Sequence, residues 1–415
     1  VRLSEPGLSG PLWARYLRAR TFLNEADATL KEIVTLPKTT LADEQLQQAI
    51  AWSRLHISPA STTEPSLDSN QREVAMKVIE LLLEKRPDLM RPVFSSPETL
   101  SLSGSNPRVM LTILERIVEN PAEQDYHWER CMARLIGLQA WVNDVDAVLQ
   151  TSEKLLACTT TPAILRATWN SVAIAHSIRR NWDVAMHAID RTIEHAAHTG
   201  EEVDTLSARG NRAYFLCHQA RYEESDWEYE DSFKRLAELQ TTRSQFELVI
   251  GGGNRALIPV YQGDWQLARS RIEEAYSVRT NGPHRVPMGL LFPCLAVSRL
   301  KEGRTDEVVP MLKQGLMDCF GTESNRFQQQ ALEFSALVAV ELNLLSLAYG
   351  LLDYVEVWRE NTRMPRSEAE MQMAKAIIDQ VPKSLRQPMF KPSTSPKAVG
   401  AEVMKAVRRE LRVNS

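Results

Sequence analysis

Apolar residues recur at the spacing of an α-helix along most of the chain, in segments of roughly 12 to 18 residues. The few prolines and glycines fall mostly between these segments, where both residue types commonly end a helix. Short runs that alternate apolar and polar residues, as strands do, are nearly absent. The pattern therefore predicts an all-α protein.

A short motif recurs along the chain, in which a turn is followed by a small residue on the first turn of a second helix. The final positions of its copies are Ala147, Ala185, Ser225, Ala268, Val308 and Ala348. These positions are separated by 38, 40, 43, 40 and 40 residues. A period near 40 residues that carries two helices is typical of a helical solenoid.

The clearest copy predicts a helical hairpin. A first helix over about Ile164–Ile178 is followed by a turn at 180–183, and Ala185, Ile189 and Ile193 then form the apolar stripe of a second helix. Since Ala185 is small, the two helices can approach closely. One hairpin cannot bury both of its apolar faces, so we expect it to stack on neighbours of the same form.

Several sequence features accompany the repeat. A small residue stands twelve positions before the one that opens the second helix, an aromatic residue often stands three positions before it, and one turn is Gly263-Asp264. The earlier small residues are Ala173, Ala213, Ala256, Ala296 and Ala336; the aromatic residues are Trp182, Tyr222 and Trp265, with Trp169 early in a first helix. Together these features resemble the tetratricopeptide-repeat (TPR) solenoids, over roughly Tyr126 to Asn361.

The repeats depart from the family pattern. They are longer than its repeat of about 34 residues, they lack its closing proline, and Arg212 and Arg255 stand where a leucine is expected. Longer repeats of this kind are similar to the sensor arms of nucleotide-switch signalling ATPases and related transcription regulators. The resemblance implies a right-handed superhelical solenoid of TPR-like hairpins that takes part in signal transduction or transcription regulation.

We expect three regions: an irregular N-terminal helical region over 1–125, the solenoid over 126–361, and a C-terminal helical cap and tail over 362–415. Candidate helices outside the repeats are Pro11–Asn24, Glu25–Leu36, Asp43–His56, Asn70–Lys85, Pro107–Glu119, Ser367–Gln380 and Ala398–Arg412. Because the first residue is Val1, we expect the chain to be part of a longer protein, with an ATPase or DNA-binding domain possible outside it.

The most specific polar signal is a repeated tetrapeptide, since Gly210-Asn211-Arg212-Ala213 recurs as Gly253-Asn254-Arg255-Ala256. The resemblance implies that Asn211 and Asn254 face the concave groove, where a carboxamide can pair with the backbone of an extended peptide. Neighbouring arginines suit a carboxylate or phosphate group. The candidate ligand-binding residues are Arg209, Asn211, Arg212, Tyr214, His218, Gly253, Asn254, Arg255 and Tyr261. The alternative is structural: the asparagines bridge helices, and the arginines pair with acids such as Glu223, Glu224 or Glu247.

Other motifs favour structure over chemistry. The glycines of Gly251–Gly253 each cost a helix roughly 1 kcal/mol relative to alanine, so we expect close helix packing there rather than an anion site. His195 and His198 lack the partners of a metal site. The five cysteines are widely spaced and form no CxxC pair, which indicates buried thiols in a reducing cytoplasm. No catalytic residue, metal ligand or cofactor is predicted.

Charge and hydropathy narrow the function. The formal net charge is -4 and the pI is about 6.2, which makes nucleic acid an unlikely partner. No segment reaches the ~20 apolar residues that a membrane-spanning helix needs. We therefore predict a non-enzymatic, cytoplasmic recognition module that binds a peptide, a protein segment or a small anionic effector on its concave face. A passive assembly scaffold, a helical-toroid hydrolase and an RNA-binding solenoid remain as alternatives, and the oligomeric state stays open.

Overall fold

The computed structural model describes residues 107–119, 125–281, 289–322 and 324–413, and every regular element within these ranges is helical. The candidate helices predicted between residues 11 and 85 lie outside the described residues. By its internal contacts the chain divides into two units, one of residues 1–139 and 153–159 and the other of residues 140–152 and 160–415. The all-α prediction is confirmed for the described part of the chain.

The first unit contains α7 (Pro107–Val118) and most of α8 (Tyr126–Trp141). The helix predicted over Pro107–Glu119 is thus confirmed. Trp128 is buried on α8, and its indole Nε1 donates a hydrogen bond of 3.3 Å to the carbonyl oxygen of Val118 at the end of α7. This bond helps to fix the two helices against each other.

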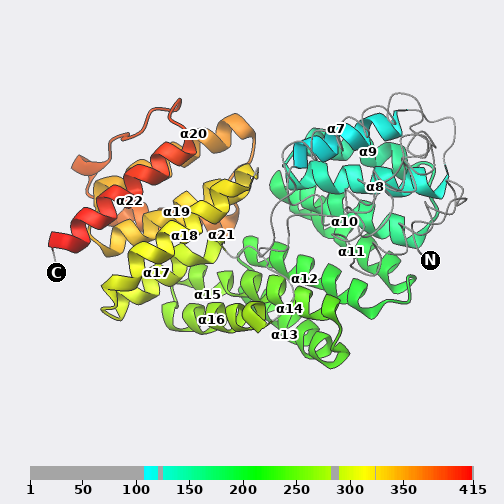
Figure 1. Cartoon of the computed structure of the whole chain (residues 1–415), viewed down its shortest axis with the longest axis horizontal. Helices are drawn as coiled ribbons and strands as arrows, with labels where there is room; N and C mark the ends of the chain where they lie inside the picture. Colours follow the sequence, from blue (N-terminus) through cyan, green and yellow to red (C-terminus); the bar gives the residue numbers. More distant parts are fainter. Residues whose placement is uncertain (1–106, 120–124, 282–288, 323, 414–415) are drawn as a thin grey trace, which may run out of the picture. The chain divides into compact units, whose positions relative to one another are not determined.

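The second unit contains the repeated hairpins (Figure 1). Its helices are α10 (Pro162–Ile178), α11 (Trp182–Ala197), α12 (Glu202–His218), α13 (Tyr222–Leu239), α14 (Thr242–Arg255), α15 (Leu257–Gln262), α16 (Trp265–Asn281), α17 (Phe292–Lys301), α18 (Val308–Gly321), α19 (Asn325–Glu341), α20 (Leu345–Thr362), α21 (Glu368–Gln380) and α22 (Pro396–Val413); α9 (Val145–Leu156) joins the two units in sequence. Helices that are consecutive in sequence pack against each other from α10 to α14 and from α16 to α20. The first helix of one hairpin can also contact the first helix of the next hairpin, as in the pairs α12–α14 and α17–α19.

Small residues set the register of the hairpins. The facing positions Ala173 and Ala185, Ala213 and Ser225, Ala256 and Ala268, Ala296 and Val308, and Ala336 and Ala348 are all fully buried. In the second of these pairs the Ser225 hydroxyl donates a hydrogen bond of 2.7 Å to the Ala213 carbonyl oxygen, which requires the two helix backbones to lie almost in contact. The predicted repeat register is therefore confirmed from Ala173 to Ala348.

Each hairpin turn places one residue in the left-handed region, five positions before the small residue of the second helix. These residues are Arg180, Ala220, Gly263, Gly303 and Asn343, with φ values of 60°, 58°, 74°, 76° and 56°. Only two of the five are glycine, so the arginine and the alanine adopt a conformation that a Cβ atom disfavours. The left-handed conformation of the turn is thus the same in all five hairpins, including those whose residue has a Cβ atom.

The C-terminal segment returns to the earlier hairpins. Helix α21 packs against α12, α15, α19 and α20, and α22 packs against α18 and α19 (Figure 1). The predicted helices at Ser367–Gln380 and Ala398–Arg412 are confirmed, with one or two residues of difference at their ends. The boundaries at 125/126 and 361/362 stay predictions. No described helix is both long enough and apolar enough to cross a membrane.

The strained turn gives a stability prediction. Replacing Ala220 by glycine removes a left-handed penalty of about 1–2 kcal/mol and adds about 0.5–1 kcal/mol of backbone entropy to the unfolded chain. We expect Ala220→Gly to raise the free energy of unfolding by up to about 1 kcal/mol. Ala213→Gly, at a helical position, is the matched control and should lower it. Urea unfolding followed by circular dichroism measures both; a loss of stability in Ala220→Gly would contradict the account.

Candidate functional site

The inner face is defined here as the surface that contacts α21, which is formed by α12, α15, α19, α20 and the α10–α11 turn. Three of the candidate residues meet on it. The ring centroids of Tyr214 and His218 lie 4.4 Å apart, those of His218 and Tyr261 lie 5.8 Å apart, and Tyr261 continues to Phe334 on α19 at 6.1 Å. His218 and Tyr261 are buried, with exposed fractions of 1% and 8%. The structure therefore joins residues from three hairpins into one aromatic cluster, and α21 packs against the helices that carry it.

Helix α21 begins with a capping box. The Ser367 hydroxyl accepts a hydrogen bond from the Glu370 backbone nitrogen at 3.2 Å, and the Glu370 carboxylate accepts one from the Ser367 nitrogen at 2.7 Å. Such a box satisfies two amides that the first turn of a helix would leave unpaired. The same two side chains also reach the inner face, since the Ser367 hydroxyl lies 2.9 Å from Nδ1 of His218.

The carboxylate of Glu370 is the centre of a buried charge cluster. It is fully buried, and its oxygens lie 2.6 Å from Arg180, 3.3 Å from Arg359 and 2.8 Å from the amide nitrogen of Gln330. Burial by itself raises the pKa of Glu370, but the Arg359 and Arg180 guanidinium groups hold that pKa well below its ordinary value. Glu370 is therefore ionised at neutral pH, and it binds α21 to helices of the stack.

A second carboxylate completes the cluster. The Glu333 carboxylate on α19 forms ion pairs with the guanidinium groups of Arg359 at 2.7 Å and Arg366 at 2.6 Å. Like Glu370, Glu333 is fully buried. A glycosidase needs one carboxyl group with a raised pKa that can donate a proton. Here guanidinium groups bind both carboxylates, and the pKa of Glu370 is lowered, which argues against a hydrolytic pair at this place.

His218 is neutral at neutral pH. Burial lowers its pKa to about 3, with a further lowering by Arg180, Arg326 and Arg359 and an opposing effect of Glu370. Its Nε2 atom is buried and has no hydrogen-bond partner among the described residues; the same holds for the Tyr261 hydroxyl and the Gln330 amide oxygen. The inner face thus carries polar atoms that α21 leaves unsatisfied.

The candidate arginines Arg209 and Arg212 lie on α12 and Arg255 lies on α14, and all three form ion pairs with acidic residues of adjacent helices. Arg209 pairs with Glu228 at 2.9 Å and with Asp231 at 2.6 Å, and Arg212 pairs with Asp190 at 3.1 Å and with Glu228. Arg255 lies 2.8 Å from Asp226 and 3.4 Å from Glu230. These pairs favour the structural interpretation, although Glu223, Glu224 and Glu247 are not the partners of these arginines.

The candidate asparagines differ in their contacts. The Asn211 amide donates a hydrogen bond of 2.8 Å to Asn170 on α10 and so bridges two first helices. Asn254 is half-buried, and no side-chain hydrogen bond to it occurs among the described residues. Gly253 is half-buried near the end of α14. The ligand-binding role of the nine candidates stays a prediction.

The glycine run on α14 serves packing. A Cβ atom on Gly251 would lie 2.6 Å from Phe233 Cε1, and one on Gly252 would lie 3.1 Å from the Cβ of Ala275. The first distance is too short for a real contact, so Phe233 on α13 can approach only because this position is glycine. The packing interpretation is confirmed for these two glycines.

Metal and thiol chemistry find no support in the described ranges. They contain no group of three or more His, Cys, Asp or Glu side chains that could hold a metal ion. His198 contacts the Glu194 carbonyl oxygen at 2.8 Å, as expected at a helix end. Four cysteines are buried as predicted, but Cys158 is exposed, so the prediction of a buried thiol is wrong for that residue. It lies just after the end of α9, where the chain leaves the helix.

Sequence reasoning missed the residues at the centre of the site. Arg180, Gln330, Glu333, Arg359 and Glu370 were not among the candidates. The Ser367-Glu-Ala-Glu370 pattern before the predicted helix was a readable capping-box signal. Its partners are far away in sequence, since Arg180 and Glu370 are 190 residues apart, and no local pattern reports such a contact.

Comparisons with known proteins show similarity only at low levels. A scan against protein-family models and a search of curated proteins gave no match. Among solved structures, the chain is similar to the APC/C hetero-tetramer Cut9–Hcn1, with a TM-score of 0.34 and 12% identity, over 85% of this chain and 67% of that chain. It is also similar to aspartyl phosphate phosphatase F from Bacillus subtilis, with a TM-score of 0.37 and 11% identity, over 92% of this chain and 95% of that one. Values this low carry no argument about function. By its own geometry the chain is a stack of helical hairpins that holds a helix on its inner face.

The buried imidazole predicts a pH dependence. Between pH 6.5 and about 3 the unfolded chain protonates His218 and the folded chain does not, so the free energy of unfolding should fall as pH falls. From pH 7 to pH 5 we expect His218 to contribute a loss on the order of 1–2 kcal/mol. The contribution of Glu370 is lost only at lower pH, as pH falls through its own lowered pKa.

The control is His218→Asn, which keeps a side chain able to bond the Ser367 hydroxyl but does not titrate. We expect a flatter pH dependence of urea unfolding for this variant, even if it is less stable at pH 7. Equal slopes for the variant and the wild type between pH 7 and pH 5 would show that His218 is not the group responsible.

Proposed function

We propose that the hairpin stack is a non-enzymatic recognition module whose inner face binds a protein segment through a buried acidic side chain. The observation that carries this proposal is the position of α21, whose Glu370 and Ser367 are bound by residues of α12, α19, α20 and the α10–α11 turn. On this view α21 is an intramolecular ligand, and the partner is a helix of similar chemistry.

The charges of the inner face support an acidic partner. Arg180 and Arg359 both contact Glu370, and a guanidinium group binds a carboxylate with paired, directional hydrogen bonds. Trp182 adds a donor, because its Nε1 lies 2.9 Å from the Glu368 carboxylate. The unsatisfied Nε2 of His218 and hydroxyl of Tyr261 offer further contacts that α21 does not use. We further propose that the protein is cytoplasmic and that this binding serves signal transduction or transcription regulation.

The test uses a fluorescently labelled peptide of residues 364–380, and fluorescence anisotropy measures its binding to the full chain. Glu370→Gln in the chain leaves buried arginine charges uncompensated, a change that typically costs ~3–5 kcal/mol. The intramolecular helix should then dissociate more readily, and the peptide should bind at least about tenfold more tightly than to the wild type.

Two controls accompany this experiment. Glu402→Gln changes an exposed acid on α22 and should leave peptide binding at the wild-type level. A peptide that itself carries Glu370→Gln should bind the variant chain weakly, because it lacks the carboxylate. If the unmodified peptide binds no better to the Glu370→Gln chain, while circular dichroism shows that the chain is folded, then the inner face is a closed core and the proposal is wrong.

A further inference from the structure

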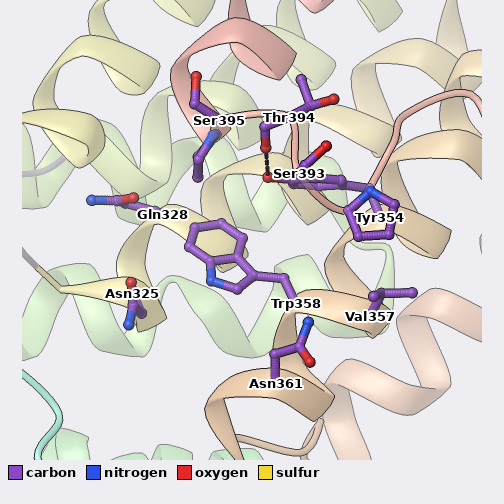
Figure 2. A pocket seen from close by; sticks show the side chains of 11 residues that line it. Asn325, Gln328, Tyr354, Val357, Trp358, Asn361, Ser393, Thr394 and Ser395 are labelled. Atoms are coloured by element: carbon purple, nitrogen blue, oxygen red, sulfur yellow. Dashed lines mark hydrogen bonds between the residues drawn. The ribbon is translucent and has the colours of Figure 1, made fainter.

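A separate cavity lies between the first turn of α19 and the last turns of α20 (Figure 2). Its volume is about 430 Å³, within the usual range of ligand pockets. Asn325 and Gln328 line it from α19, Trp358 and Asn361 line it from α20, and residues 392–396 form the opposite wall. The cavity shares no lining residue with the inner-face site, so its role is independent of the proposed function.

The cavity carries no charge. None of its lining residues is Asp, Glu, Lys, Arg or His. A phosphate or carboxylate ligand would enter it without a counter-charge, which is costly in a partly buried place. An uncharged lining of this kind favours a ligand that is itself neutral at the site of contact.

The wall places polar, uncharged side chains around an aromatic ring. Figure 2 shows Trp358 in the middle, with Asn325 and Gln328 to one side, Asn361 below and Ser393 and Ser395 above. The Trp358 indole nitrogen and the Asn325 and Asn361 amides have no hydrogen-bond partner within the described part of the chain. A tryptophan indole only donates, and each asparagine carboxamide can donate as well as accept, so these three side chains can bind the carbonyl oxygens of a ligand.

The opposite wall contains a turn of this chain whose backbone carbonyl is bound by a side chain of α20. The segment Pro392-Ser-Thr-Ser-Pro396 is uncharged and has a proline at each end. Its Thr394 carbonyl oxygen accepts a hydrogen bond of 2.7 Å from the Tyr354 hydroxyl on α20. An aromatic residue of α20 thus binds a backbone carbonyl of a proline-flanked turn at the edge of the cavity.

From this geometry we infer that the cavity binds an uncharged, proline-containing peptide in an extended conformation. A polyproline II segment has no internal hydrogen bonds, so its carbonyls are free acceptors, and its conformation is formed before binding. Aromatic-lined grooves bind such segments by packing proline rings on aromatic faces. Trp358 supplies the face and one donor, while Asn325 and Asn361 donate to carbonyls on either side of it.

The experiment uses the full chain and a short amidated, fluorescein-labelled peptide made only of Pro, Ser and Thr. We expect saturable binding by fluorescence anisotropy, and a matched peptide with each Pro replaced by Ala should bind at least about fivefold more weakly. In the chain, Asn325→Ala and Asn361→Ala should each weaken binding about fivefold, the value of one lost hydrogen bond near 1 kcal/mol. Trp358→Phe keeps an aromatic ring at this half-buried position, removes the indole donor, and should weaken binding by a similar factor.

Three controls define failure. Gln387→Ala changes an exposed carboxamide outside the cavity, and Glu402→Gln changes an exposed acid on α22; both should leave binding unchanged. Unchanged peptide binding in the Asn325→Ala/Asn361→Ala double variant overturns the inference, as does the absence of saturable binding to the wild type. If sucrose or adenosine protects the chain against thermal unfolding in a Trp358-dependent way and the peptide does not bind, the cavity is a small-molecule site and the peptide assignment is wrong.

Discussion

The structure depends on one steric constraint, the close approach of two helices within each hairpin. Where the helices meet, the side chains are alanine, serine or valine, and Ala185, Ser225 and Ala268 are fully buried. The bond from the Ser225 hydroxyl to the Ala213 carbonyl shows how little space remains between the backbones. With this close approach in each hairpin, α12 lies against α14 and α17 lies against α19, and α12, α15 and α19 form part of the surface on which α21 packs.

The inner face combines burial with charge in an unusual way for a helix interface. Two carboxylates and three guanidinium groups, from Glu333, Glu370, Arg180, Arg359 and Arg366, lie largely out of water. Removing charges from water is costly, and a buried pair often contributes little net stability, so its more general effect is to select one arrangement over others. The neutral His218 beside Ser367 fits the same view, since its proton would add to an existing excess of positive charge. We therefore expect the cluster to determine where α21 binds more than how strongly.

Much of the fold was readable from the sequence because its determinants are local. The small residues, the turn positions and the helix at Ser367–Gln380 all follow from spacing within about 40 residues, and the structure bears them out. The site was less readable. Arg209, Arg212 and Arg255 stood out because they repeat, yet their guanidinium groups pair with acids of α13 or of adjacent helices. Arg180 and Arg359 share no motif, and only the folded chain brings them to Glu370. The candidate residues Tyr214, His218 and Tyr261 do lie together in the structure, but their ligand-binding role stays a prediction, and α21, which packs against the helices that carry them, belongs to the segment expected as a C-terminal cap.

The return of α21 to both α12 and α19 also constrains how such a chain can change over evolution. An open array of repeats can gain or lose a unit at small cost, since each unit contacts only its neighbours. Here the helix spans the hairpins between α12 and α19, so an added or deleted unit would separate Glu370 from Arg180 or Gln330. The number of hairpins is therefore constrained by one carboxylate in the first turn of α21, which must reach Arg180 and Gln330 at once.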